Sequence, residues 1–202
     1  MAPLTPNAIK AFVDRVAKLP GIGPRQATRL AFYLVGQGKD AIHALAKAVA
    51  DIEKLRICAR CYSIHDAPGS LCGICADPKR EASIIAVVEK ETDLISIERT
   101  RRFHGRYLVL GELQKIGALD TEKKLRVKSL IHWIEKELSG KAKEIILALS
   151  PTAAGDLNAS LLAKEFRPYA ERLTRLGRGI PTGGEIEFAD EETLTSALDR
   201  RS

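Results

Sequence analysis

The spacing of apolar residues divides the chain into two patterns. In the first 55 residues, apolar side chains recur every three or four positions, which is the spacing of one face of a helix. This spacing predicts helices over residues 6–18, 24–35 and 39–55, with Gly36 and Gly38 ending the second. The apolar positions of the first and third helices are Ile9, Phe12, Val13, Val16, Ile42, Leu45, Val49 and Ile52.

After Arg80, short and almost continuously apolar runs alternate with longer amphipathic segments. Such runs are typical of strands buried on both faces, and they lie at residues 83–88, 107–110 and 144–149. Residues 171–176 are expected to form a fourth strand. Helices are predicted at residues 91–100, 121–138 and 156–166. The alternation predicts a parallel α/β sheet with right-handed crossovers. Trp133 is expected in its core, and the tail is expected to form a short strand at 186–188 and a final helix after Asp190.

The composition is that of a soluble globular protein. The 202 residues are 45% hydrophobic and 29% charged, which allows a sizeable core and a charged surface. No apolar run reaches the length of a membrane span, and the first residues lack the apolar stretch of an export signal. We therefore expect a cytoplasmic protein that has no membrane partner.

The positive charge is confined to the first part of the chain. The net charge is +6, and residues 1–80 hold 12 Lys or Arg against 6 Asp or Glu, whereas the remainder holds 20 of each kind. This asymmetry favours a phosphate-binding face in the first 80 residues. A solvated helix surface is the alternative for the individual lysines.

A glycine-framed turn between the first two helices is a candidate phosphate site. Gly21 and Gly23 permit a tight turn, and Pro24 is suited to the first position of the helix that follows. The free N–H groups at such a helix start attract anions, and Arg25 and Arg29 lie on one face just behind it. Gly21, Gly23, Arg25 and Arg29 are predicted to contact DNA. The alternative is a simple helical hairpin.

All four cysteines lie in one short segment, as Cys58-x2-Cys61-x10-Cys72-x2-Cys75. Two such pairs at this separation can supply four sulfurs to one tetrahedral Zn²⁺, and four sulfurs leave no open position for catalysis. The spacing therefore predicts one structural zinc ion per chain. A redox-active pair is the main rival interpretation. The nearby His65 is expected to be an exposed loop residue.

Two acidic residues fall at predicted carboxyl ends of strands, where α/β sheets place their functional groups. Glu89 follows the first strand and Asp156 follows the third. Together they could hold Mg²⁺ for phosphoryl transfer. The structural alternative is that Asp156 is a helix N-cap and that Glu89 favours a helix start. We favour the structural alternative, because a metal cluster normally needs a third acidic group.

The order of these motifs resembles the RecR family of bacterial recombination mediators. The resemblance rests on LPGIGPRQATRLAFYL, the four cysteines, the strand that ends in VVEK and the segment RLGRGIPTGGEIEFADEETLTSAL, and it spans nearly the whole chain. It implies an α plus α/β multidomain fold. The expected parts are a helix-hairpin-helix domain (1–55), a four-cysteine zinc finger (56–79), a Toprim domain (80–177) and a C-terminal assembly segment (178–202).

The resemblance also implies a function. Members of the family form ring-like homotetramers that clamp DNA, and they act with RecO and RecF to load RecA onto gapped or single-stranded DNA. The basic hairpin positions of the family match Arg25 and Arg29, and its zinc ligands match the four cysteines. We therefore expect a non-catalytic clamp that binds double- and single-stranded DNA without sequence preference.

Two departures from the family pattern concern the Toprim part. Ala154 stands where the family usually has an acidic residue, so Glu89 and Asp156 are expected to be remnants of the acidic set. Residues 111–117 replace a loop that usually reads like Ser-Pro-Leu-Asp-Gly. An incomplete acidic set argues against the alternative function, a metal-dependent Toprim enzyme such as a nuclease, primase or topoisomerase.

Overall fold

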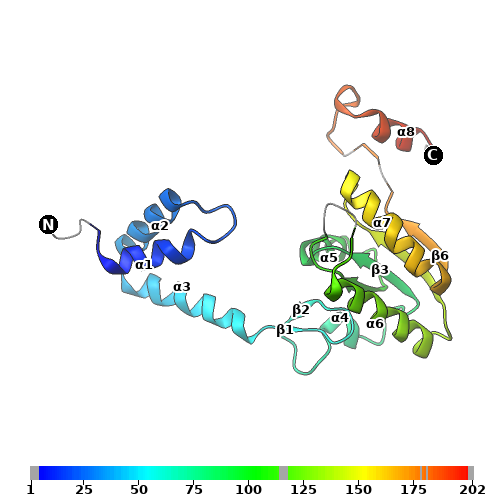
Figure 1. Ribbon diagram of the computed structural model, residues 1–202, viewed down its shortest axis with the longest axis horizontal. Helices are drawn as coiled ribbons and strands as arrows, with labels where there is room; N and C mark the ends of the chain where they lie inside the picture. The colour runs from blue at the N-terminus through cyan, green and yellow to red at the C-terminus, as the bar shows by residue number, and fades with distance from the viewer. Residues whose placement is uncertain (1–4, 114–117, 178, 181, 200–202) are drawn as a thin grey trace. The chain divides into compact units, whose positions relative to one another are not determined.

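The chain divides into two compact units, Met1–Leu55 and Arg56–Ser202. The computed structural model (Figure 1) describes residues 5–113, 118–177, 179–180 and 182–199. The expected four-part division at residues 55, 79 and 177 stays a prediction. No helix of the described residues is long and apolar enough to cross a bilayer.

The first unit consists of three helices, as predicted. They are α1 (Asn7–Val16), α2 (Pro24–Gln37) and α3 (Lys39–Asp51), and a 3₁₀ turn, η1 (Ile52–Lys54), follows them. Pro24 is the first residue of α2, with Gly23 as its N-cap. Gly38 separates α2 from α3 with a φ of 90°, a conformation that suits glycine, so α2 ends two residues later than predicted.

The first unit has a very small core of its own. Among its described residues, only Ile9, Ala27 and Ala31 are buried hydrophobics. No residue of α3 is buried, and its large apolar side chains are exposed: Ile42, Leu45, Val49 and, in η1, Ile52. Three buried side chains form a very small core for a unit of 55 residues. The exposed apolar face of α3 is therefore available to pack against a further surface.

The second unit is built on a parallel sheet, as predicted. Its strands are β3 (Ile84–Val88), β4 (Arg106–Val109), β5 (Ala142–Ala148) and β6 (Ala170–Arg175), and they are arranged in the order β4-β3-β5-β6. The connecting helices are α5 (Glu91–Arg99), α6 (Thr121–Glu137) and α7 (Ala153–Phe166), with a 3₁₀ turn, η2 (Arg167–Tyr169), before β6. Every neighbouring pair of strands is parallel.

Both faces of the sheet are buried, which explains the continuous apolar runs. Ile85 and Val87 point toward α6 and α7, where they join a core that includes the fully buried Phe166. Ala86 and Val88 point the other way and pack with Leu94 of α5. Because successive strand residues face opposite sides, a strand between two helical layers needs apolar residues at every position.

The cysteine segment folds into small elements of its own. These are the antiparallel pair β1 (Arg56–Ile57) and β2 (Ile64–His65) and the one-turn helix α4 (Gly73–Ala76). The C-terminal residues form a 3₁₀ turn, η3 (Ile186–Phe188), and the helix α8 (Glu191–Asp199).

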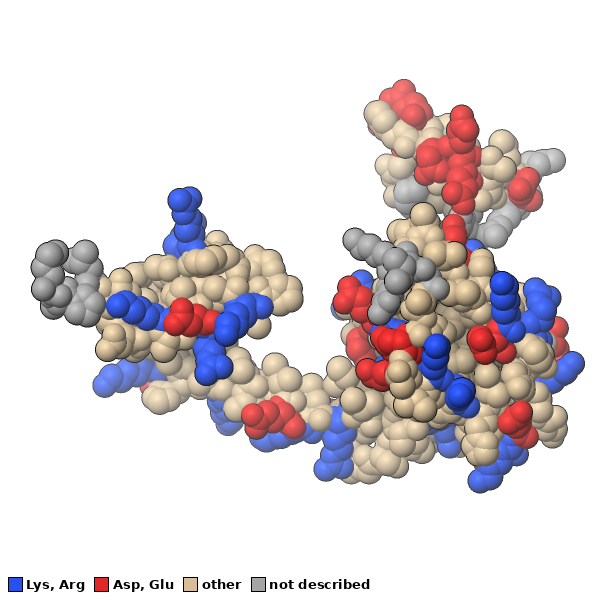
Figure 2. Space-filling model, in the orientation of Figure 1, with Lys and Arg blue, Asp and Glu red and all other residues tan. Residues whose placement is uncertain are grey.

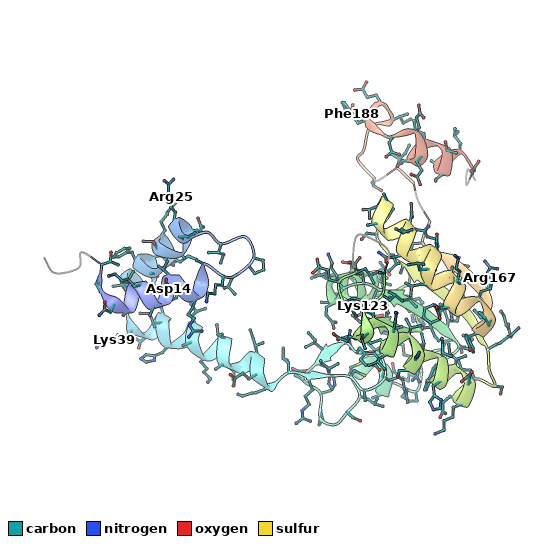
Figure 3. The ribbon with its side chains drawn as sticks, in the orientation of Figure 1. Asp14, Arg25, Lys39, Lys123, Arg167 and Phe188 are labelled. Atoms are coloured by element: carbon teal, nitrogen blue, oxygen red, sulfur yellow. The ribbon has the colours of Figure 1, made fainter. Side chains whose placement is uncertain are left out.

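The strand predicted at residues 186–188 was therefore wrong. The N–H of Phe188 bonds to the carbonyl of Glu185 at 3.2 Å, and the N–H of Ala189 bonds to that of Ile186 at 3.1 Å. These turn-type bonds satisfy the backbone locally, which a three-residue segment cannot achieve as a strand without a neighbour. Phe188 is 80% exposed, and Figure 3 shows it on the turn before α8.

An ion pair joins the segment before β3 to α5. Arg80 pairs with Glu98 and also donates to the carbonyl of Gly105 at 3.1 Å, while the hydroxyl of Tyr107 donates to Glu98 at 2.7 Å. Arg80 and Tyr107 together hold the pKa of the Glu98 carboxyl below its usual range, Arg80 being the larger cause. Burial, with the bond to Glu98, raises the pKa of Tyr107. This network fixes the start of the sheet against one covering helix.

We predict that Glu98→Gln lowers the melting temperature at about pH 7. A carboxyl whose pKa is depressed by folding contributes stability above its unfolded pKa of about 4.3, and that contribution is lost as the pH falls through the folded value. The difference from the wild type should therefore shrink as the pH falls from about 4.3 through the lower folded pKa of Glu98. Glu171→Gln, an exposed carboxyl on β6, is the control. A pH-independent difference would contradict the assignment.

Candidate functional site

The four cysteine sulfurs form a compact cluster. Cys58, Cys61, Cys72 and Cys75 are all buried free thiols, and their Sγ atoms lie within 4.8 Å of one another. Among the described residues, this is the one group of three or more His, Cys, Asp or Glu side chains that could hold a metal ion. The predicted ligands are thus brought together as a four-sulfur site.

Backbone hydrogen bonds shape the two cysteine pairs around the cluster. The N–H of Cys72 points at Cys58 Sγ at 3.3 Å, and the N–H of Cys75 points at Cys72 Sγ at 3.4 Å. The Ser63 hydroxyl lies 3.1 Å from Cys61 Sγ. Donors aimed at sulfur stabilise thiolates, the form that binds metal. The donor set and its surroundings therefore fit a thiolate metal centre.

The thiols influence one another strongly. Hydrogen bonding from Cys75, with further bonds from Ser63, lowers the pKa of the Cys61 thiol to about 5. The same bond to Cys61, together with burial, raises the pKa of Cys75. Four buried sulfurs at this spacing cannot all be ionised without a cation, so the cluster could hold a metal ion.

His65 is buried, so the expected exposed loop position was wrong. Strand β2 places Ile64 outward, at 54% exposed, and His65 inward, at 9% exposed. Pairing of β2 with β1 fixes this alternation. No hydrogen-bond partner for either ring nitrogen is found in the described part of the chain, and His65 is outside the four-sulfur group.

The cysteine segment is attached to the sheet by two backbone carbonyls. The carbonyl of Cys61 accepts from the N–H of Val109 at 2.8 Å. The carbonyl of Cys75 accepts from Arg60 at 3.2 Å and from Arg106 at 3.3 Å. Since β4 is an edge strand, the bond to Val109 also covers part of an edge that would otherwise be open. The metal site and the sheet are thus one connected structure.

A second set of contacts joins the cysteine segment to α5 and α6. Glu91, the first residue of α5, accepts from the N–H of Ile64 at 2.8 Å. Arg126 of α6 lies over the ring of Tyr62, with 5.0 Å between the guanidinium carbon and the ring centroid, and donates to the carbonyl of Val109 at 2.9 Å. None of these residues was singled out from the sequence, because no local pattern marks a contact between distant segments.

The two acidic residues have separate partners. Glu89 directly follows β3 and accepts from the N–H of Leu113 at 3.0 Å. Asp156 lies in the first turn of α7 and is ion-paired with Arg175 at the end of β6. Both acids therefore lie at the carboxyl edge of the sheet, as predicted, but each one is engaged in holding a neighbouring segment. Residues 114–117 of the altered loop lie outside the described residues.

Asp156 is not the N-cap of α7. That helix begins at Ala153, and the hydroxyl of Thr152 accepts from the N–H of Gly155 at 3.1 Å, which makes Thr152 the cap. The helix starts early because Gly155 can approach the carbonyl of Ser150, where any Cβ would lie 2.0 Å from the oxygen. Ala154 occupies the first turn without a carboxylate.

The turn before α2 has the geometry expected of an anion site. Gly21 has a φ of 77°, which favours glycine, and no side chain caps the helix. The N–H groups of Arg25 and Gln26 have no carbonyl within the helix to bond, whereas the N–H of Ala27 bonds to Gly23 at 2.9 Å. Arg25 and Arg29 are exposed. Figure 3 shows Arg25 projecting from the start of α2, away from α1 and α3.

Three family models match the chain. A model of the RecR helix-hairpin-helix matches residues 9–52, a Toprim domain model matches residues 83–177, and a model of the RecR C-terminal region matches residues 179–202.

Curated relatives match over almost the whole length. The recombination protein RecR of Acidothermus cellulolyticus is 40% identical over 200 residues, which cover 96% of each chain. That of Bifidobacterium longum is 40% identical over 197 residues, with 95% of this chain and 94% of the relative covered. That of Chloroherpeton thalassium is 36% identical over 201 residues, with 98% of both covered.

The chain combines a helix-hairpin-helix, a four-cysteine metal-binding site and a Toprim sheet. This combination defines a protein of DNA recombination and repair. The identity and coverage of the relatives make the family plain: the chain belongs to the RecR family. Its role accordingly lies in recombinational repair.

We predict that Cys58→Ser removes the bound metal and lowers the melting temperature by at least about 5 °C, because metal binding at such a site contributes directly to folding. Metal content by elemental analysis and melting by circular dichroism provide the measurements. His65→Ala is the matched control: it removes a nearby potential ligand and should leave one metal ion per chain. Loss of metal in that control would add His65 to the ligands.

Proposed function

We propose that this chain is a non-catalytic clamp that holds DNA during recombinational repair in the bacterial cytoplasm. In this role it acts with RecO and RecF to help load RecA at gaps and on single-stranded DNA. The observation that carries the proposal is the start of α2, where unbonded N–H groups and two exposed arginines lie on one small surface. These groups suit phosphate, which is common to all DNA.

The contact is expected to hold DNA without reading its sequence. Backbone N–H groups and guanidinium groups bond phosphate oxygens, and such contacts position a protein on DNA but do not distinguish bases. Double- and single-stranded DNA therefore both qualify as partners. Gly21 and Gly23 contribute by allowing the backbone to approach closely, and Arg25 and Arg29 contribute charge.

The non-catalytic part of the proposal is supported by the acidic residues. Metal-dependent phosphoryl transfer needs several carboxylates converging on one ion. Glu89 instead accepts from the backbone of Leu113, Asp156 pairs with Arg175, and Ala154 supplies no carboxylate. The clamp thus predicts no Mg²⁺-dependent cleavage of DNA, and cleavage lost on Glu89→Gln would favour the Toprim enzyme instead.

We assign Zn²⁺ to the four-cysteine cluster. Zinc prefers tetrahedral sulfur ligands, and a site with four protein sulfurs has no open position for substrate. The ion's role is therefore structural: it organises a segment whose buried residues are chiefly the cysteines themselves, with Leu71 and Ile74 packed against them.

We also propose that the clamp is a ring of several copies, with a tetramer as the expected size. Two apolar surfaces support self-association: the face of α3 and the exposed Ile186, Phe188 and Leu198 of the C-terminal segment. Acidic residues gather around the latter (Figure 2), which limits its binding to surfaces that are not themselves acidic. Closure around DNA would allow several weak contacts to act together.

The double variant Arg25→Gln, Arg29→Gln should bind DNA at least about tenfold more weakly at low salt, whatever the sequence, because charge-assisted hydrogen bonds to phosphate are lost. The slope of log affinity against log salt should fall by about 0.9 for each phosphate contact removed. Fluorescence anisotropy with labelled duplex and single-stranded DNA measures both. Lys39→Gln, Lys47→Gln removes the same charge from α3 and is the control. Equal weakening in both double variants would refute the assigned surface.

Changing the α3 face should reduce assembly. Leu45→Asp, Val49→Asp places two charges on the exposed apolar face, so the mass measured by light scattering should fall below that of the wild type. Lys47→Asp, at a position between them that faces another way, should leave the mass unchanged. An unaltered mass in the double variant would exclude this face from the interface.

A further inference from the structure

A cavity of about 170 Å³ lies where the cysteine segment, the sheet and α6 meet. Leu71 comes from the cysteine segment, Arg106 from the first residue of β4, and Leu130 and Trp133 from α6. The cavity is thus at the amino ends of the strands, whereas Glu89 follows the carboxyl end of β3. It is a different place from both the acidic edge and the turn before α2, and we name it the Trp133 cavity.

Trp133 packs against the main hydrophobic core, as expected, but it is only partly buried. Two arginines lie over its ring: the guanidinium carbon of Arg60 is 5.6 Å from the ring centroid, and that of Arg106 is 5.9 Å from it. Both side chains line the cavity. The walls therefore combine an aromatic ring with two positive charges.

The two positive charges are close together, and neither forms an ion pair with a carboxylate in the described residues. Both guanidinium groups donate to the carbonyl oxygen of Cys75, at 3.2 and 3.3 Å, so the two donor nitrogens are at most about 6.5 Å apart. In addition, Arg106 Nε is buried without a hydrogen-bond partner in the described part of the chain.

This arrangement favours an anion. Like charges at this separation repel each other, and an anion that contacted both would remove the repulsion. A buried donor without a partner is costly, and an acceptor that reached Arg106 Nε would relieve that cost. Arginine is also the side chain whose geometry best matches a carboxylate.

The size and lining of the cavity restrict the rest of the ligand. A cavity of about 150 Å³ with apolar walls holds one benzene ring, so about 170 Å³ suits one six-membered ring rather than a purine. Besides the arginines, the lining offers the Ser129 hydroxyl and the indole N–H of Trp133. Tyr107 is also among the lining residues, but its side chain packs on the α5 face of the sheet, where its hydroxyl donates to Glu98. The polar edge of a nucleobase would thus find few partners, and a phosphate alone would leave the apolar walls unfilled.

We propose that the Trp133 cavity binds a single aromatic ring that carries a carboxylate. The ring occupies the apolar space beside Leu130 and Trp133, and the carboxylate accepts hydrogen bonds from Arg60 and Arg106. The ligand is either a free aromatic acid or a segment of a partner protein in which an aromatic side chain lies beside acidic residues. Both sources offer the same chemistry to the site.

The chain contains a single tryptophan, so its fluorescence reports on this cavity directly. Full-length, metal-loaded protein is titrated with phenylacetate, with 2-phenylethanol, which lacks the carboxylate, and with acetate, which lacks the ring. We expect a saturable change with phenylacetate at an affinity at least about tenfold above that of either analogue, the effect of one charge-assisted hydrogen bond. A short blocked peptide, Asp-Phe-Asp, tests the partner-protein source.

Two variants test the site itself. Arg106→Gln should weaken phenylacetate binding by about tenfold. Ser129→Leu keeps both arginines but fills the cavity, so it should abolish binding even if the first variant folds poorly. Arg56→Gln, an exposed arginine on β1, is the charge-matched control and should bind as the wild type does. Metal content and melting temperature verify that each variant is folded.

The outcomes distinguish a free aromatic acid from a partner segment, and they also test whether the cavity binds a ligand at all. Tighter binding of the peptide than of phenylacetate identifies a partner segment, and the reverse identifies a free acid. Equal affinity for phenylacetate and 2-phenylethanol, unchanged binding in Ser129→Leu, or no saturable fluorescence change with any probe would overturn the proposal. In that last case Arg60 and Arg106 serve only to attach Cys75 to α6. The DNA-binding tests on α2 are independent of each of these results.

Discussion

The attachment of the cysteine cluster to the sheet is the constraint on which the second unit depends. The cluster orders a segment that has almost no other buried side chains, and the carbonyls of Cys61 and Cys75 transmit that order to β4 and its surroundings. The segment then covers the open edge of β4, a place where a bare strand would invite pairing with another chain. A metal held by the four cysteines would therefore act well beyond its ligands, because backbone groups beside the sulfurs also bond to the sheet.

Most of the fold could be predicted from the sequence, because its signals are local. Apolar runs marked β3, β4 and β5, since strands between two helical layers bury both faces. The start of α2 was marked by Gly23 and Pro24, whose backbone preferences act at their own positions. The grouping of four cysteines likewise followed from spacing alone.

The errors arose where contacts between residues, rather than each residue's own preference, decide. Asp156 was expected to cap α7, but Gly155 lets the chain turn earlier, against the carbonyl of Ser150, so Thr152 takes that position. His65 was expected outside, yet pairing with β1 turns it inward. Arg60 and Arg106, which both lie over Trp133, are 46 residues apart in the sequence, and no local sequence pattern predicts that they lie close together. The assignment of DNA and metal roles to individual residues stays a prediction.

The small core of the first unit has a consequence for how the protein behaves in a cell. A helical unit whose described residues bury only Ile9, Ala27 and Ala31 gains little free energy of folding from its own packing. Burial of the α3 face against another surface would add to that free energy, and by mass action the gain would grow with the concentration of the chain. Under dilution, therefore, the part that carries the proposed DNA-binding turn would be the first to lose its order, so that the abundance of the protein would regulate how much of it is ready to bind.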